Sequence, residues 1–161
     1  MYNHAPAGYV CPFCLVAAGI EHEHVYTTQR DVVLRTAQVT AFVAAAWWPN
    51  NPGHVLIIPN QHFENLYELP PEYAASIHTA SQRVALALKA TYGCAGTSTR
   101  QHNEPAGNQD VWHYHLHLFP RYPNDQLYEL TARRRRASLE ERVPYAERLR
   151  DWLTANAPGC D

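Results

Sequence analysis

An alternating run of histidines constrains the fold of this chain more than any other feature. The segment from Trp112 to Phe119 reads WHYHLHLF, with an imidazole at every second position inside it. Because successive side chains of a β-strand point to opposite faces, a strand here would present the three histidines on one face. Tyr114, Leu116 and Leu118 would then occupy the other face, which belongs against a hydrophobic core. We therefore expect a sheet in which one strand carries a histidine-lined surface.

Three chemical settings could explain imidazoles at positions 113, 115 and 117. The simplest is the polar outer face of an edge strand, although charged imidazoles in a row would repel one another. The second is a three-histidine metal site, but ligands spaced about 7 Å apart along one face cannot all reach bonds of about 2 Å. The third is an anion site, in which the imidazoles share the roles of nucleophile and hydrogen-bond donor. Spacing alone does not choose between the metal site and the anion site, although adjacent imidazoles that hold separate phosphate oxygens fit this geometry better.

The rest of the chain predicts an antiparallel α+β domain, because strands come in runs with few strand-helix-strand alternations. The long helix is the best marked element, since apolar residues recur at helical spacing and Gly93 supplies a C-terminal stop. Ser138 and Glu141 form a capping-box pattern for a terminal helix. In chain order we expect two or three short strands over 25–44, a core strand over 54–59, a helix over Pro70–Tyr92, strands over 94–101 and 111–119, and a helix over 138–155.

Composition narrows the class of protein. The chain has 161 residues, 46% of them hydrophobic, and a formal net charge of -2, so one core is expected and bulk charge gives no reason to expect a nucleic-acid partner. Its longest apolar stretch, Val39 to Trp48, is shorter than a membrane span, and the N-terminus lacks the pattern of a secretory signal. We therefore expect a cytoplasmic protein with no membrane partner.

Cysteine spacing adds a second motif. Cys11 and Cys14 form a Cys-x-x-Cys pair, whereas Cys94 and Cys160 stand alone and are interpreted as an ordinary core residue and a tail residue. In a reducing compartment such a pair more often binds a metal or carries out redox chemistry than forms a structural disulfide. A pair of buried apolar cysteines is the plainer alternative.

Together these motifs resemble the signature of the histidine triad superfamily. The histidine run is preceded by Asn103-Glu104 and by Gly107-Asn108-Gln109, and the upstream segment 51–62 reads NPGHVLIIPNQH. Cys11-Pro-Phe-Cys14 resembles the zinc-bearing N-terminus of many bacterial members. The resemblance covers about Tyr9 to Tyr122. It implies a single domain over 1–161, with an antiparallel sheet of about five strands, one long helix packed on it, and a C-terminal extension over 123–161 that holds the terminal helix.

The resemblance also implies catalytic roles. The middle histidine of the triad is the family's nucleophile, here His115, which attacks the α-phosphorus, releases the leaving group and leaves a nucleotidyl-histidine for water to hydrolyse. His117 and His54 match the family's phosphate-side and relay histidines, which donate hydrogen bonds to phosphate oxygens or protonate the leaving group. Besides His117, the implied phosphate-binding residues are Asn103, Gly107 and Gln109.

A structural zinc site is implied by the same resemblance. In members with the Cys-x-x-Cys pair, the first triad histidine is a zinc ligand, so Cys11, Cys14, His62 and His113 make a closed set of the Cys₂His₂ type. Such an ion would brace the strand that presents the nucleophile. His22 and His24 are rival ligands in principle, and we interpret them as surface residues of a solvated turn.

Several positions depart from the family pattern. Many members bind ribose hydroxyls through an aspartate near the end of the strand that corresponds to 39–46, where this chain has alanines followed by Trp47 and Trp48. Asp110 stands where relatives often carry a hydroxyl residue, and its charge would repel phosphate if it pointed inward. We interpret the two tryptophans as core residues and the run Arg133 to Arg136 as a solvated charge cluster.

The sequence therefore predicts a hydrolase that acts on a nucleoside phosphate of the dinucleoside polyphosphate or nucleoside phosphoramidate type. One alternative is nucleotidyl transfer, because the cysteine pair and zinc histidines also resemble galactose-1-phosphate uridylyltransferases. Those enzymes have a His-Pro-His nucleophile motif and are about twice as long, whereas Tyr114 and Leu116 separate the histidines here. A second alternative is a nucleotide-binding or scaffold protein with little turnover. The family resemblance also implies a homodimer formed through the long helix and an adjoining strand.

Overall fold

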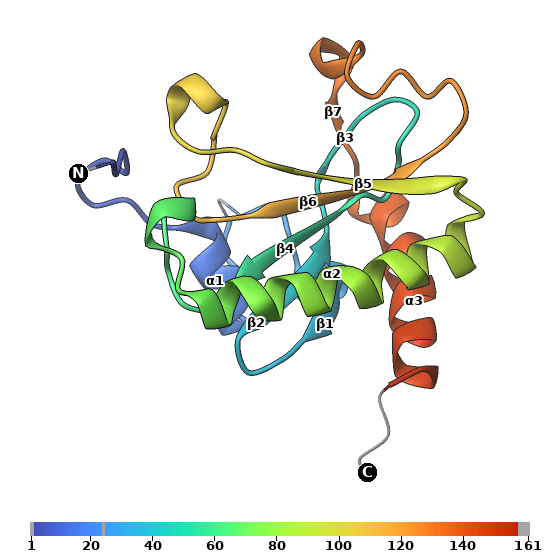
Figure 1. Cartoon of the computed structure of the whole chain (residues 1–161), viewed down its shortest axis with the longest axis horizontal. Helices are drawn as coiled ribbons and strands as arrows, with labels where there is room; N and C mark the ends of the chain where they lie inside the picture. The colour runs from blue at the N-terminus through green and yellow to red at the C-terminus, as the bar shows by residue number, and fades with distance from the viewer. Residues whose placement is uncertain (1, 24, 158–161) are drawn as a thin grey trace.

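A five-stranded antiparallel sheet forms the centre of the structure (Figure 1). The computed structural model describes residues 2–23 and 25–157. Every neighbouring pair of strands in the sheet is antiparallel. In spatial order the strands are β1 (Val32–Arg35), β2 (Val39–Val43), β4 (Val55–Pro59), β6 (Leu116–Arg121) and β5 (Gly96–Gln101). The predicted α+β fold with an antiparallel sheet is confirmed.

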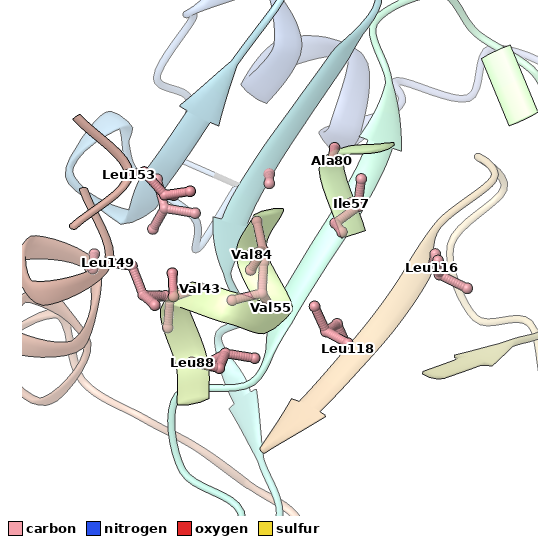
Figure 2. Packing of buried hydrophobic residues seen from close by; sticks show 14 of the residues in the cluster. Val43, Val55, Ile57, Ala80, Val84, Leu88, Leu116, Leu118, Leu149 and Leu153 are labelled. Atoms are coloured by element: carbon pink, nitrogen blue, oxygen red, sulfur yellow. The ribbon is translucent and has the colours of Figure 1, made fainter. Parts of the chain in front are cut away.

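Two helices cover one face of this sheet. The long helix α2 (Pro71–Tyr92) crosses the strands, and the C-terminal helix α3 (Leu139–Ala155) lies beside the C-terminal half of α2 (Figure 1). Alternate strand residues point toward both helices, and burial of each large aliphatic side chain contributes about 1.5–3 kcal/mol. Figure 2 shows these side chains, which include Val43, Val55, Ile57, Leu118, Val84, Leu88, Leu149 and Leu153. Both predicted helices are confirmed, as is the capping box at Ser138.

The opposite face of the sheet is only partly covered. The short helix α1 (Pro12–Ala18) packs Phe13 and Val16 against Phe42 and Ile58 of the central strands. The rest of this face belongs to a second group of side chains, which consists of His54, His117, Phe119 and Trp48. The sheet therefore separates the face that carries His54 and His117 from the core beneath the two helices.

The structure corrects the bounds of one predicted strand. The strand expected over 111–119 begins only at Leu116, and it continues past Phe119 to Arg121, with Pro120 in register opposite Thr97. His113 and His115 precede the strand, although the backbone between them is held by a hydrogen bond from the Tyr114 N–H to the carbonyl of Phe63. Of the two or three short strands expected over 25–44, the structure forms β1 and β2. Residues 25–31 before them form an irregular segment and a 3₁₀ turn over Gln29–Asp31, where Thr28 and Asp31 cap one another.

Besides the packing of α3 on the core, two polar contacts attach the C-terminal extension near the ends of β1 and β2. A two-residue strand, β7 (Arg135–Arg136), pairs with β3 (Ala46–Trp47) in a separate ribbon beyond the end of β2. In addition, the buried guanidinium of Arg142 in α3 binds both carboxylate oxygens of Asp31 at 2.8 and 2.9 Å. The extension thus reaches the end of the sheet near the triad. No helix in the described part of the chain combines the length and hydropathy needed to cross a lipid bilayer.

Candidate functional site

His115 lies in the wall of a cavity of about 240 Å³ on the open face of the sheet. Its side chain is only 2% exposed, and the edge of the Phe13 ring packs against it. The Nδ1 atom lies 2.7 Å from the carbonyl oxygen of His113, and since a carbonyl only accepts, Nδ1 must carry the proton. The neutral ring therefore has its lone pair on Nε2, which has no hydrogen-bond partner among the described residues. This is the tautomer that a nucleophilic imidazole requires.

His54 and His117 stand next to this ring as a pair. Their rings stack with centroids 5.5 Å apart, and Nε2 of His54 lies 3.4 Å from Nδ1 of His117. Burial, together with the positive charge of Arg100, lowers the pKa of His54 to about 3. Burial and the neighbouring imidazoles and arginine also hold the pKa of His117 well below its ordinary value. Both rings are therefore neutral near pH 7 and carry one N–H each, and one of these two N–H groups is used in the contact between the rings.

The predicted phosphate-binding residues lie in the loop before the triad. The side chain of Asn103 accepts a hydrogen bond from the Leu66 N–H at 2.8 Å and exchanges bonds with the amide of Gln101. Gln109 is 5% exposed, and its amide donates to the carbonyl of Glu64 at 2.6 Å. Gly107 accepts a hydrogen bond from a ring nitrogen of His102. These three residues shape the loop, and of the three only Gln109 lines a cavity next to the triad.

Cys11, Cys14, His62 and His113 converge on one point beside α1. Their potential ligand atoms all lie within 4.8 Å of one another. The distance from Sγ to Nδ1 is 3.3 Å for Cys11 and His113 and 3.3 Å for Cys14 and His62. A tetrahedral zinc ion with Zn–S bonds of about 2.3 Å and Zn–N bonds of about 2.1 Å places sulfur and nitrogen ligands about 3.6 Å apart. The four side chains therefore fit a zinc ion.

A further hydrogen bond orients His113 in this cluster. Its Nε2 donates to the carbonyl oxygen of Pro59 at 3.0 Å, so the lone pair of the neutral ring lies on Nδ1, the atom that faces the cysteine sulfurs. Of the rival ligands, His22 is exposed and is absent from this cluster. His24 and Cys160 lie outside the described residues.

A second cavity, of about 570 Å³, adjoins the first. It is lined by Arg100 and His102, neither of which had a predicted role. Arg100 lies directly opposite His117 in the register of β5 and β6, so the two side chains share a face of the sheet. Only the register of β5 could have indicated this, and the sequence does not specify that register.

The C-terminal extension lines both cavities. Arg134 borders both, and Arg136 borders the first and lies over the ring of Tyr26. The arginine run is therefore part of the site wall, which the interpretation as a solvated cluster missed. Of the two tryptophans, Trp47 belongs to the core beneath the sheet, whereas Trp48 is buried and also lines both cavities.

Asp110 also lies at the boundary between the cavities. Its carboxylate is 3.4 Å from Nη1 of Arg134, and both side chains are about half exposed. Ala44, Ala45 and Ala46 line the first cavity, where many relatives were expected to carry a ribose-binding carboxylate. Among the described residues that line this cavity, Asp110 is the only acid.

Comparisons with known proteins agree with the fold and the motifs. The HIT domain model matches residues 26–124. Protein hit of Bacillus subtilis is 34% identical over 114 residues, which are 70% of this chain and 71% of that protein. An adenosine 5'-monophosphoramidase of Saccharomyces cerevisiae is 35% identical over 74 residues, 45% of this chain and 44% of that enzyme.

A solved structure gives the same result. The crystal structure of a Zn-bound histidine triad family protein from Mycobacterium smegmatis superposes with a TM-score of 0.71 at 25% sequence identity, and the match covers 90% of this chain and 94% of that one. The family model spans more than half of the chain and includes all three triad histidines. The chain therefore belongs to the HIT domain family, the histidine triad proteins.

Proposed function

We propose that this protein is a nucleotide hydrolase in which His115 is the nucleophile. The observation that carries the proposal is the hydrogen bond from Nδ1 of His115 to the His113 carbonyl, which leaves the Nε2 lone pair available on a ring that lines a cavity. An imidazole held in this tautomer needs no base to activate it. The ring is shielded from bulk water but accessible to a small molecule that enters the cavity.

The reaction proceeds in two steps, a displacement at phosphorus and a hydrolysis. Nε2 of His115 forms a bond to the α-phosphorus while the bond from that phosphorus to the leaving group breaks, and the leaving group departs with the electron pair and takes up a proton. Water then attacks the phosphorus, the P–N bond breaks, and a nucleoside monophosphate is released with the imidazole restored. Dividing one displacement into two easier ones is the gain from a covalent intermediate.

His117 stabilises the charge that develops on the phosphate oxygens, and His54 fixes its tautomer. His54 is buried and neutral, and its Nε2 lies 3.4 Å from Nδ1 of His117. When Nε2 of His54 donates in this bond, the proton of the neutral His117 ring lies on Nε2, where it can donate to a phosphate oxygen. Gln109 lines the second cavity, but its side-chain amide donates to the carbonyls of Glu64 and Val111, so its contribution is to hold the loop in place. Phosphate binding by Asn103 and Gly107 stays a prediction from the family resemblance.

The zinc ion has a structural role in this proposal. The ligand set is closed, with two thiolates and two imidazoles and no position left for substrate, which is the pattern of structural zinc. When bound, the ion supplies cross-linking between α1, the segment after β4 and the segment before β6. The homodimer, the cytoplasmic location and the extent of one domain over 1–161 stay predictions from the sequence.

Substitution of the nucleophile tests the proposal. Wild-type protein, His115→Gln and a matched control, His78→Gln on the exposed side of α2, are incubated with the p-nitrophenyl ester of AMP and with adenosine 5'-phosphoramidate. We expect wild type and His78→Gln to release AMP, and His115→Gln to lose activity by at least about 10³-fold while it still binds AMP.

Trapping the intermediate makes the test specific. Protein quenched in acid-free denaturant during turnover should carry one nucleotidyl group on a peptide that contains His115, and the His115→Gln variant should carry none. Full activity of His115→Gln, or a nucleotidyl group on another residue, would overturn the mechanism. Wild-type protein that binds AMP but turns over neither compound would favour the alternative of a binding protein, and transfer of the nucleotidyl group to added phosphate would favour a nucleotidyltransferase.

A further inference from the structure

The two cavities meet at the triad, and their linings differ in character. Trp48, Asp110, His117 and Arg134 border both cavities. The first cavity is otherwise lined mainly by apolar side chains, which include Phe13, Val25, Leu56, Val111 and the three alanines at 44–46. The second is lined by Arg100, His102, Asn108, Gln109 and Thr131. A substrate whose α-phosphorus faces His115 thus has an apolar chamber on one side for its nucleoside and a polar chamber on the other for its leaving group.

The dominant charge in the polar chamber is the guanidinium of Arg100. Its central carbon lies 5.0 Å from the centroid of the Trp48 ring and 5.1 Å from that of Phe119, so aromatic faces hold it in place. Its Nε atom is buried without a hydrogen-bond partner. Among the described residues no carboxylate forms an ion pair with it. Burial lowers the pKa of Arg100, which shows that its charge is poorly compensated where it stands.

The second cation of the chamber is Arg134. Its side chain is 49% exposed, and its Nη1 lies 3.4 Å from the carboxylate of Asp110, which is the only acid among the described lining residues. Two arginines against one aspartate leave the chamber with a net positive charge. The planar guanidinium presents a fork of N–H donors that can bind two oxygens of a phosphate group.

We propose that the polar cavity is a leaving-group subsite for a negatively charged phosphate chain, with Arg100 as its main contact. The inference rests on the proposed hydrolase function and narrows it. The preferred substrate is a nucleoside phosphate joined through a phosphoanhydride to a further phosphate-bearing group. In the first step the bond between the α-phosphorus and the anhydride oxygen breaks, and that oxygen leaves with the phosphate chain. A small amine, as in a phosphoramidate, would leave Arg100 without an anion.

The kinetic test compares two substrates that share AMP and differ in the leaving group. Attack on the α-phosphorus of diadenosine triphosphate releases ADP, a leaving group with two charged phosphates. The p-nitrophenyl ester of AMP releases p-nitrophenol, which has no phosphate. In Arg100→Met we expect the ratio of kcat/KM for the triphosphate to kcat/KM for the ester to fall at least tenfold, the effect of losing a charge-assisted hydrogen bond. Arg100→Lys keeps a positive charge and should lose less.

A matched control is available elsewhere on the surface. The guanidinium of Arg148 lies over the rings of Tyr92 and Tyr145 at 5.0 and 4.7 Å, which resembles the packing of Arg100, but it borders neither cavity. Arg148→Met should leave the substrate ratio as it is in wild type. An unchanged ratio in Arg100→Met, whether both kcat/KM values stay the same or fall by the same factor, would overturn the subsite.

A binding measurement separates the subsite from the proposed function. Inorganic pyrophosphate is titrated into His115→Gln protein, with and without the additional Arg100→Met change, by isothermal calorimetry. We expect the second change to weaken binding at least tenfold, whatever the turnover of wild-type protein. If neither substrate is hydrolysed, the proposed function fails while this titration still decides the subsite. If pyrophosphate binding is absent or indifferent to Arg100, the subsite fails even where hydrolysis dependent on His115 persists.

Discussion

The Nδ1 atom of His115 lies 2.7 Å from the carbonyl oxygen of His113, whose own Nδ1 faces the cysteine sulfurs of the candidate zinc site. One short piece of backbone thus joins the residue that would bind the ion to the residue that would attack phosphorus. Because this stretch lies just before β6, the sheet ladder does not hold it. Its position depends on the His113 ring and on the Tyr114 bond to Phe63.

Loss of zinc should therefore affect both stability and the nucleophile. We expect wild-type protein to contain one zinc ion per chain and Cys14→Ser to contain much less, by elemental analysis. Free zinc at about 100 times its Kd stabilises a folded protein by about 2.7 kcal/mol, and urea denaturation of Cys14→Ser should show a loss of at least this size. Cys94→Ser, which changes a cysteine outside the cluster, should keep its zinc. Full zinc occupancy in Cys14→Ser would contradict the site.

Stability should decrease in mild acid because His54 is buried in its neutral form. The pKa of His54 is lowered from 6.5 to about 3, so between these values the unfolded chain binds a proton that the folded protein does not. The free energy of unfolding then falls as the pH falls from 6.5 toward 3, by about 1.4 kcal/mol per pH unit for this residue, and its full contribution is present above pH 6.5.

The matched measurement is urea denaturation of wild type and His54→Gln at a series of pH values from 7.5 to 4.5. Glutamine does not titrate, so the slope of unfolding free energy against pH should be shallower in the variant by about one proton. The comparison of slopes cancels contributions from the zinc ligands and from the histidines that do not contact His54. Parallel slopes in the two proteins would show that His54 is not held neutral.

Gly53 should be among the least replaceable residues in the chain. Its φ is +73°, and a Cβ atom there would lie 2.4 Å from the ring of Tyr145 in α3. Gly93 has a similar φ of +63° but open space around it, so Gly93→Ala measures backbone strain alone, about 1–2 kcal/mol. Gly53→Ala adds the overpacking cost of about 1–3 kcal/mol. Thermal and urea denaturation of the two variants should separate these effects, and equal losses would contradict the close contact.

The ion pair between Arg142 and Asp31 should be essential for attaching α3. Arg142 is 3% exposed and Asp31 is fully buried, so Arg142→Leu leaves a buried carboxylate without its partner. Loss of one member of a buried pair typically costs about 3–5 kcal/mol. Adding Asp31→Asn to Arg142→Leu removes the unpaired charge, and the double variant should be less destabilised than the sum of the single changes. Additive losses in urea denaturation would show that the two residues are not coupled.

Asp110 should weaken anion binding in the polar cavity. Its carboxylate lies beside Arg134 and competes with a phosphate chain for that guanidinium. Because both groups are about half exposed, the expected effect of Asp110→Asn is modest, about 0.5–1 kcal/mol. This corresponds to a two- to fivefold tighter Kd for pyrophosphate, measured by the same calorimetric titration. Weaker binding in Asp110→Asn would show that the carboxylate positions Arg134 instead of competing for it.

The regular elements of this fold could be predicted from local patterns. The long helix has an apolar face and a glycine stop, and the last helix has a capping box, so each is specified within its own segment. The strand boundaries around the triad could not be predicted in the same way. His113 and His115 continue the alternation of β6, but the ladder partners of this stretch end at Leu116, and pairing between distant segments is not written in the local sequence.

In the site, too, some residues could be predicted from local patterns and others only from the pairing of distant segments. The cysteine pair and the triad were recognisable because their spacing is short and specific, whereas His62 and His113 were assigned to the metal through the family resemblance. The structure brings these two histidines to Cys11 and Cys14 as expected. Arg100 carried no such signal, since its importance comes from a register that places it opposite His117. Arg134 and Arg136 were visible as a charge run, but only the pairing of β7 with β3 brings them to the cavity.

The ribbon of β3 and β7 has a consequence for how this protein can change. It holds the arginine segment to the cavity rim through only two paired positions, Ala46 with Arg136 and Trp47 with Arg135, and it is separate from the five-stranded sheet that carries the histidines. The same extension also packs Leu127 against Trp48 and Phe119, and the Phe119 ring stacks on His54 and His117. A substitution at Arg134 or Arg136 can therefore alter the charge of the rim alone, whereas a substitution at Leu127 also reaches the reacting histidines.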